Sequence, residues 1–408
     1  MIFDIGIGSR QSIFAALFLG LAGMSSPAWS GGLAGEESTE AVRGMAVQNS
    51  ALTLPAGVPD GDSLYVGDGS SNTIKRFSAR TGHYLGDFVA STDAAKDYTL
   101  AGPRGLIFAL GKLYVVNQDT NLPYPGELLR FQGRTGEFVD RIVPHESAHA
   151  PYAPRGMIRG IGRSLYVANY VPGPTPDYPN GDFSGPGALM EFDADSGAYL
   201  GAFDFKRFGP HFWPRGVVLG PDGLLYVTTT GNWEASPADL LSGYILRFNP
   251  FTRKYVDTFA SFDSTTGSSS AGSCAKALHR PEGLVFGPDG RLYVTSFRVD
   301  VSDNDRILVY DVRSRRCVDT IELGASESSG ATRAAAQALI FGPGGRLFVP
   351  TNLSRSGATA GGEIRRYDVR TKRHDVFVSC DLATHCPAPN PWYLIFGQTD
   401  PRTLEYND

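Results

Sequence analysis

The sequence has 408 residues, with 37 Lys and Arg against 42 Asp and Glu, so its formal net charge is −5. A partner such as nucleic acid or an acidic membrane requires a basic face, and this balance argues against both. Charged residues are 19 % of the chain and aromatic residues 11 %, and there are 49 glycines. Such a composition is too apolar for a disordered chain and favours many short strands joined by turns.

The first 30 residues predict a cleaved secretory signal peptide. An apolar run from Ser12 to Met24 follows Arg10 and precedes Ala28-Trp29-Ser30, which has small residues where a signal peptidase reads. The run is shorter than the ~20 residues of a membrane span, and no second long apolar stretch follows, so we expect no integral membrane span. The alternative for this segment is a buried N-terminal strand or helix. We expect a signal peptide at 1–30, a flexible lead-in at 31–50 and one domain at 51–408, in a secreted or periplasmic monomer.

A repeated pattern dominates the rest of the chain. The word Leu-Tyr-Val, or Leu-Phe-Val in the last copy, recurs at intervals of 49, 52, 60, 67 and 55 residues. A strand-like run that begins with Gly or Ala precedes most copies, and two more strand-like runs follow each copy. The central aromatic residues of the word are Tyr65, Tyr114, Tyr166, Tyr226, Tyr293 and Phe348.

Four short antiparallel strands in a unit of about 50 residues are typical of a β-propeller blade, which covers its apolar faces by stacking on neighbours. The first unit lacks a first strand, and the C-terminal segment Trp392–Gly397 repeats the word that is missing. We therefore predict an all-β, six-bladed propeller of four-stranded antiparallel blades, with the first blade closed by a C-terminal strand. The tail Thr403–Tyr406 resembles a further second strand and does not fit this scheme. Seven blades, with Ala51–Leu54 recruited, are the alternative.

One stretch of the fifth unit resembles a known group of propellers. The segment Pro281-Glu282-Gly283-Leu284, followed by Gly287-Pro288-Asp289-Gly290 and Leu292-Tyr293-Val294, is similar to NHL repeats. The wider set includes gluconolactonase-like, streptogramin-lyase-like and amidating-lyase-like propellers, and the resemblance covers about residues 60–400. It implies the fold but leaves the activity open, because these relatives perform different reactions or none.

The long loops predict which face carries a site. They follow the second strands and join the blades, so they emerge on one face, whereas the other face has only short turns. The residue before each first-strand Gly or Ala, here called the head residue, should lie where the channel opens on the long-loop face. Clustered guanidinium groups favour a small anion, although structural bonds to loop carbonyls or to Glu282 are the alternative. The six head residues are Arg104, Arg155, Arg215, Glu282, Gln337 and Trp392.

A second ring of oxygen-bearing residues lies two positions after the second-strand Val: Asp68, Asn117, Asn169, Thr229, Ser296 and Thr351. The gluconolactonase-like resemblance implies a divalent cation such as calcium, held by Glu282 with Asn117, Asn169 and Asp68. The arginine heads would repel such an ion, so no cofactor is certain. Glu282, His211 and His279 are the candidates for acid–base chemistry, and exposed loop histidines are the alternative.

The predicted order of strands and loops also places the four cysteines. Cys380 and Cys386 share one inter-blade loop and predict a local disulfide. Cys317 begins a fourth strand on the short-turn face, whereas Cys274 lies in a loop on the other face. A five-residue strand is ~17 Å long and a disulfide needs Cα atoms within ~7 Å. We therefore expect this second pair not to form, unless loop 261–273 runs down the rim.

Two functions remain open from the sequence. The first is a binding module for a small anion, a glycan or a protein on the long-loop face. The second is a metal-assisted hydrolase or lyase, similar to a lactonase, at the same site. The sequence shows neither a complete set of metal ligands nor a nucleophile motif, so catalysis stays undecided.

Overall fold

The computed structural model describes residues 61–93, 95–118, 125–170, 186–209, 212–231, 241–300, 302–324, 333–351, 361–380 and 385–407. The predicted signal peptide and lead-in lie outside these ranges. In the described ranges, no helix is both long and apolar enough to cross a membrane.

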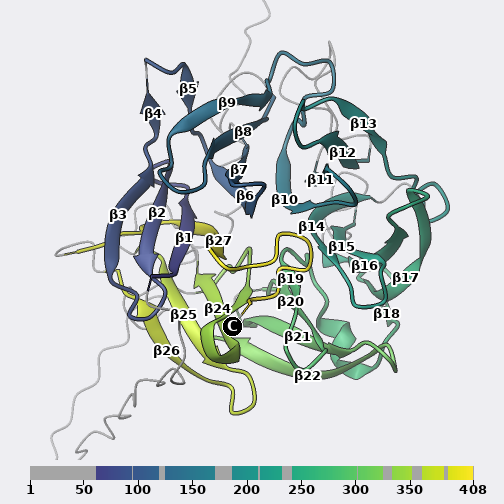
Figure 1. Cartoon of the computed structure of the whole chain (residues 1–408). Coiled ribbons are helices and arrows are strands. Elements are labelled where there is room, and N and C mark those ends of the chain that lie inside the picture. The colour runs from purple at the N-terminus through teal and green to yellow at the C-terminus, as the bar shows by residue number, and fades with distance from the viewer. Residues whose placement is uncertain are drawn as a thin grey trace, which may run out of the picture. The chain divides into compact units, whose positions relative to one another are not determined.

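The described residues form six antiparallel sheets arranged as a ring (Figure 1). Blade one contains β27 (Pro391–Phe396), β1 (Ser63–Asp68), β2 (Thr73–Ser78) and β3 (Tyr84–Val89). Blade two contains β6 (Pro103–Ala109), β7 (Lys112–Asn117), β8 (Glu127–Gln132) and β9 (Phe138–Val143). Blade three contains β10 (Pro154–Arg159), β11 (Ser164–Asn169), β12 (Ala188–Asp193) and β13 (Tyr199–Ala202).

Blade four contains β14 (Trp213–Leu219), β15 (Leu225–Thr230), β16 (Gly243–Asn249), β17 (Lys254–Asp263) and a short fifth strand, β18 (Ser268–Ser269). Blade five contains β19 (Leu284–Phe286), β20 (Leu292–Ser296), β21 (Asp305–Asp311) and β22 (Arg316–Leu323). Blade six contains β23 (Ile340–Gly342), β24 (Arg346–Thr351), β25 (Glu363–Asp368) and β26 (Arg373–Val378). Outside the blades lie the small hairpin β4 (Thr92–Asp93) and β5 (Tyr98–Thr99) and the 3-10 helices Ser273–Ala277 and Pro343–Gly345.

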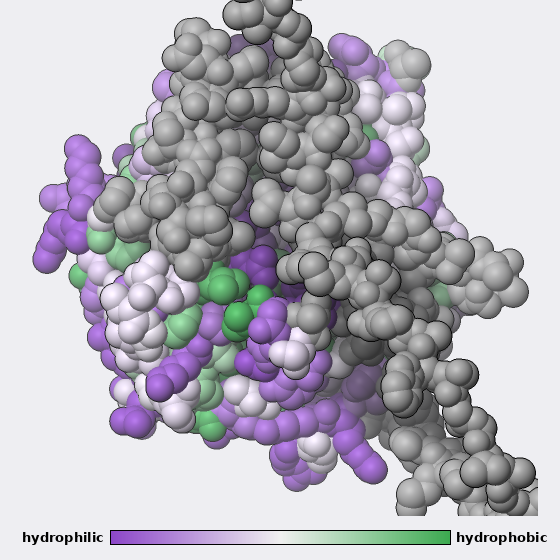
Figure 2. Space-filling model, turned by 180° about the vertical axis from the view of Figure 1, so that it is seen from behind, coloured by the Kyte–Doolittle hydropathy of each residue, from purple (hydrophilic) through white to green (hydrophobic). Residues whose placement is uncertain are grey.

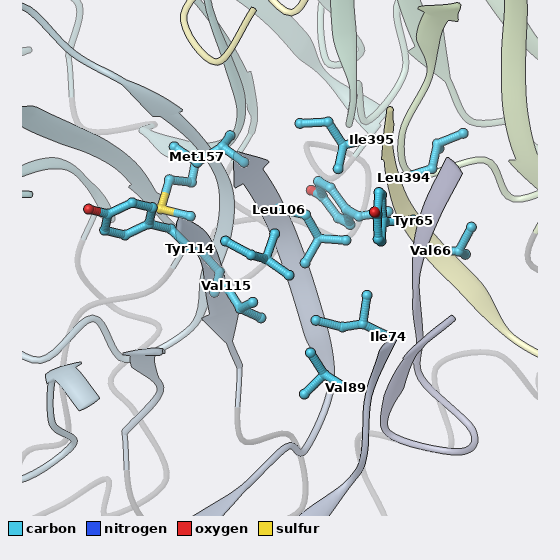
Figure 3. Close-up of a cluster of buried hydrophobic side chains, with 14 of the residues drawn as sticks. Tyr65, Val66, Ile74, Val89, Leu106, Tyr114, Val115, Met157, Leu394 and Ile395 are labelled. Carbon is cyan, nitrogen blue, oxygen red and sulfur yellow. The ribbon is translucent and has the colours of Figure 1, made fainter. Parts of the chain in front are cut away.

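The ring is closed by the last strand of the chain, as the sequence predicted. Strand β27 pairs antiparallel with β1, and this register sets Leu64 opposite Phe396 and Val66 opposite Leu394. Figure 3 shows Leu394 and Ile395 beside Tyr65 and Val66 in one apolar cluster. Blade one is thus built from both ends of the domain, and the number of blades is six.

The repeated aromatic residue packs one blade against the next. The ring of Tyr226 meets Phe286 of the following blade edge to face at 5.1 Å between centroids, and Tyr293 meets Phe341 in the same way at 5.1 Å. The last contact of the series, Phe348 with Phe396 at 4.9 Å, joins blade six to the C-terminal strand. Burial of these rings stabilises each blade only when its neighbour is present, which explains the repetition of the word.

The C-terminal tail, which resembled a further second strand but did not fit the predicted scheme, adds no strand to a blade in the described part of the chain. After β27 the chain crosses the middle of the ring (Figure 1), where the carbonyls of Pro401 and Arg402 accept hydrogen bonds from the N–H groups of Arg159 and Leu219 at 2.7 and 3.1 Å. Both donors end innermost strands, so the tail lies at the short-turn end of the channel. Leu404 packs against apolar clusters from all around the ring.

Both pairs of cysteines form disulfides. The predicted Cys380–Cys386 bridge is confirmed, with Cα atoms 4.1 Å apart. The expectation that Cys274 and Cys317 stay apart was wrong, because their Cα atoms lie 5.7 Å apart in a disulfide. The reason is the path of the loop: after β18 the chain returns along the rim, and the carbonyl of Ala271 accepts a hydrogen bond from the N–H of Cys317 at 2.7 Å.

Candidate functional site

The head residues meet at one end of the channel because glycines let the innermost strands approach closely. A Cβ on Gly105 would lie 2.7 Å from the carbonyl oxygen of Arg155, and one on Gly156 would lie 2.8 Å from that of Arg215. A Cβ on Gly216 would lie 2.5 Å from the carbonyl oxygen of Glu282. Each glycine therefore contacts the head residue of the following blade, which the sequence alone implied only by repeat equivalence.

Three of the heads form one contact group. Arg104 donates hydrogen bonds to the side-chain oxygens of Gln118 and Gln337, and its guanidinium lies 4.0 Å from the centre of the Trp392 ring. Because Arg104, Trp392 and Gln337 belong to blades two, one and six, this group spans one side of the channel mouth. The Arg104 side chain is buried and is held by neutral partners.

Two of the other heads lie over the ring of Tyr170, and the third, Glu282, pairs with one of them. The Arg215 guanidinium lies 3.9 Å from the centre of that ring and Arg155 lies 5.4 Å from it. Arg215 also forms an ion pair with Glu282, whose side chain is 3 % exposed. Tyr170 follows the second-strand Asn169, and its part in the site was not predicted from the sequence.

The charges at the mouth are unbalanced. Among the described residues, Glu282 pairs with Arg215, whereas no ion pair joins Arg104 or Arg155 to a carboxylate. Burial, together with the charge of Arg155, holds the pKa of Arg104 well below its usual value, and burial with the charge of Arg215 lowers the pKa of Arg155. Burial also acts on Arg215, but the carboxylate of Glu282 raises its pKa overall. The repulsion among these cations would be relieved by an added anion.

Directly inside the head residues lies a small apolar cavity of about 50 Å³. Its wall consists of the small residues after the heads and the aliphatic residues that follow them, and Leu404 from the tail closes the end away from the arginines. Blade one is the exception to the ring of small residues, because Tyr393 stands where the other blades have Gly or Ala. That irregularity is the sequence signal that would have identified Tyr393 as a site residue.

Tyr393 brings a hydroxyl group into the apolar channel. This hydroxyl and the second carboxylate oxygen of Glu282 are buried without a hydrogen-bond partner in the described part of the chain. Burial, reinforced by the charge of Glu282, raises the pKa of Tyr393 to about 12. Tyr393 therefore stays protonated at neutral pH and is available as a hydrogen-bond donor.

The second predicted ring holds the backbone. The side-chain oxygen of Asn117 accepts a hydrogen bond from the N–H of Ala101 at 2.8 Å, and that of Asn169 accepts one from Ala153 at 2.9 Å. Asp68 accepts bonds from the N–H groups of Ser71 and Asn390, both at 2.7 Å. The equivalent Thr229 and Ser296 do the same for Trp213 and His279, and Thr351 instead donates to the carbonyl of Glu363 at 3.1 Å.

This arrangement does not fit the predicted cation site. The oxygens of Asp68, Asn117 and Asn169 already accept bonds from the strand entries of their own blades, and Glu282 is paired with a guanidinium. Hard cations need several oxygen ligands turned toward one point. No cluster of three His, Cys, Asp or Glu side chains suited to a metal occurs among the described residues.

Of the two histidine candidates, the structure describes His279 alone. His211 lies outside the described residues. His279 is buried, with its Nδ1 3.1 Å from the carbonyl oxygen of Leu241 and its ring edge to face with Phe262 at 4.7 Å between centroids. Burial lowers the pKa of His279. These contacts give His279 a place in the packing of the blade four to blade five connection.

Further basic residues border the arginine cluster. Arg333 forms a two-pronged pair with the buried Asp305, at 2.6 and 3.1 Å, and its guanidinium lies 4.8 Å from the centre of the Phe297 ring. Arg280 lies 5.5 Å from the same ring, and burial, together with the charge of Arg333, lowers its pKa to about 10. These two arginines have no equivalents in the other repeats, so the repeat pattern did not predict them. On the face opposite to that in Figure 1, hydrophilic residues border a hydrophobic group near the middle (Figure 2).

Comparisons with known proteins assign neither a family nor an activity to this chain. No protein-family model matches the sequence, and no curated protein is similar to it. Among solved structures, virginiamycin B lyase from Staphylococcus aureus is 14 % identical, with a TM-score of 0.44 over 79 % of this chain and 82 % of the other. A luciferin-regenerating enzyme is 13 % identical, with a TM-score of 0.47 over 74 % of this chain and 86 % of the other. At these levels of sequence identity and structural similarity, the activities of the two enzymes say nothing about the chemistry of this chain. The chain is a six-bladed β-propeller, and its own residues define the candidate site.

Proposed function

We propose that this chain is a secreted or periplasmic propeller of the NHL type that binds a small organic anion at the arginine-lined channel mouth. The observation that carries the proposal is the charge at the axis: three clustered guanidinium groups and one paired carboxylate. Buried cations without counter-ions are costly, so a site of this kind gains free energy when an anion enters.

The surrounding groups suit a carboxylate or phosphate. A guanidinium donates two parallel hydrogen bonds to such an anion, and Arg155 has no carboxylate partner among the described residues. Tyr393 supplies a neutral donor because its pKa is raised to about 12. Two disulfides in a chain without free cysteines support export, since such bonds persist in oxidising compartments.

The test uses an Arg155→Ala variant and isothermal titration with acetate, citrate and inorganic phosphate at low ionic strength. A hydrogen bond to a charged group contributes ~1.5–3 kcal/mol, so we expect affinity for the anion that binds best to fall about ten- to hundredfold. The anion affinity of Arg155→Lys should lie between those of wild type and Arg155→Ala, because lysine keeps the positive charge but lacks the planar guanidinium that donates two parallel hydrogen bonds. Arg370, an exposed residue in the turn after β25, gives the control Arg370→Ala. Equal affinities of wild type and Arg155→Ala would contradict the proposal.

A second function, a hydrolase or lyase at the same site, is favoured by one observation. The free oxygen of Glu282 and the hydroxyl of Tyr393 are both buried without partners in the described part of the chain, and a carboxylate can accept a proton while a phenol donates one. We derive no step through a metal, because the predicted ligands do not fit one. A screen of esters and lactones with wild type, Glu282→Gln and added chelator tests this alternative, which requires turnover that disappears in Glu282→Gln.

A further inference from the structure

The apolar cavity inside the arginine cluster has two ends of different chemistry. At the outer end lie the head residues, three of which carry guanidinium groups, and the glycines that follow four of the heads line the cavity itself. At the inner end lies Leu404, which lines the cavity together with the innermost strands. A ligand that enters from the mouth would place its anionic group nearest the arginines and its remaining atoms against these apolar side chains.

A hydrogen-bonded turn in the C-terminal tail positions the residue at the floor of the cavity. Asp400 accepts hydrogen bonds from the N–H groups of Arg402 and Thr403 at 2.8 and 3.0 Å, and its carbonyl accepts one from Leu404 at 2.9 Å. Leu404 has a φ of 58°, a conformation that costs free energy for a branched side chain. Together with the bonds from Pro401 and Arg402 to the innermost strands, this tight turn fixes the Leu404 side chain on the channel axis.

The size of the cavity limits what fits. A cavity of about 150 Å³ holds benzene, or about 25 Å³ for each carbon, so 50 Å³ accepts about two carbons. We infer that the ligand is a short-chain monocarboxylate, with its carboxylate on Arg155 and about two further carbons toward Leu404, and that Leu404 sets the permitted chain length. This inference rests on the proposed function of the mouth and names the ligand class.

The experiment measures binding of acetate, propionate, butyrate, hexanoate and octanoate by isothermal titration. Each methylene that enters the cavity adds ~0.8 kcal/mol, so affinity should rise about fourfold from acetate to propionate and then stop rising or fall. Leu404→Ala removes three carbons from the floor and should move the best chain to hexanoate. Leu404→Phe should fill the cavity and flatten the series while acetate still binds. Glu405→Ala, an exposed neighbour in the tail, should leave the series unchanged.

The outcomes separate the two levels of the proposal. Binding of all five acids with one affinity, lost in Arg155→Ala, would keep the anion site and overturn the cavity inference. An unchanged optimum in both folded Leu404 variants would also overturn it. Failure of all five acids to bind wild type, while citrate or inorganic phosphate binds and loses affinity in Arg155→Ala, would overturn the cavity inference alone. Failure of citrate and inorganic phosphate as well would remove the proposed function itself. Circular dichroism and thermal unfolding confirm the fold of each variant, and Leu404→Phe remains informative if Leu404→Ala does not fold.

Discussion

Replacing Glu282 by Gln should weaken the fold and strengthen anion binding. The substitution keeps the size of the side chain and removes the negative charge that pairs with Arg215. The two side chains are 3 % and 10 % exposed, and breaking a buried pair leaves an uncompensated charge at a cost of about 3–5 kcal/mol. Because Gln keeps an oxygen acceptor, we expect the lower end, about 3 kcal/mol, in the free energy of unfolding measured with urea.

The gain in binding follows from the same charge. An anion bound about 7 Å from Glu282 is repelled by roughly 2 kcal/mol at an effective dielectric constant of about 20. Removing that repulsion should tighten binding of the anion that wild type prefers by about thirtyfold at low ionic strength, and less in salt. Saturating anion should also restore part of the lost stability, since a ligand at a hundred times its Kd adds about 2.7 kcal/mol.

The matched control is Glu363→Gln. Glu363 pairs with Arg365 at 2.7 Å, and the two side chains are 0 % and 1 % exposed, within β25 rather than at the channel mouth. This variant should lose comparable stability and show wild-type anion affinity. A folded Glu282→Gln protein that is as stable as wild type, or that binds anions more weakly, would refute the reasoning from charge balance.

Three further predictions concern the scaffold. Replacing Cys274 and Cys317 by Ser should lower the free energy of unfolding by about 4 kcal/mol, because the disulfide closes a loop with a separation of 43 residues. Replacing Cys380 and Cys386, with a separation of 6, should lower it by about 2 kcal/mol. Equal losses of stability in denaturant titrations would contradict this. Gly156→Ala should destabilise the ring by roughly 1–3 kcal/mol, because its Cβ would meet the carbonyl of Arg215 at 2.8 Å, whereas Gly324→Ala has open space and should be neutral. Burial lowers the pKa of His279. As the pH falls through about 6.5, the imidazole therefore binds a proton in the unfolded chain but stays neutral in the folded chain. The free energy of unfolding should consequently decrease from pH 7 to pH 5. That slope should be smaller in His279→Gln, and an identical slope would show that other groups cause it.

Much of the architecture could be predicted because a propeller repeats its local pattern. The Leu-Tyr-Val word places an aromatic residue against the next blade in each copy, so its spacing reports the number of blades. The missing first strand and the matching C-terminal segment predicted the closure between β1 and β27. The head series was predicted for the same reason, since equivalent positions in a ring share one axis.

The predictions failed where a segment departs from the repeat. Loop 264–272 returns along the rim and carries Cys274 to Cys317, a path set by its hydrogen bond to β22 and not by any periodic signal. The second ring resembled metal ligands in the sequence, because Asn and Asp serve equally well as acceptors for backbone N–H groups. Only the observed bonds to Ala101, Ala153 and Asn390 distinguish the two uses.

The amino-acid sequence by itself predicted the blades, the closing strand and the positions of the arginines and favoured six blades over seven, because each follows from a periodic pattern that local strand geometry converts into a ring. The tertiary structure alone decided what these arginines face. Glu282 pairs with Arg215, whereas Arg155 has no carboxylate partner within the described ranges. Tyr393 and Leu404 line the cavity. All these arrangements depend on side chains from distant segments that meet at the axis. Such contacts leave no local signature, since they arise from the packing of six blades at once.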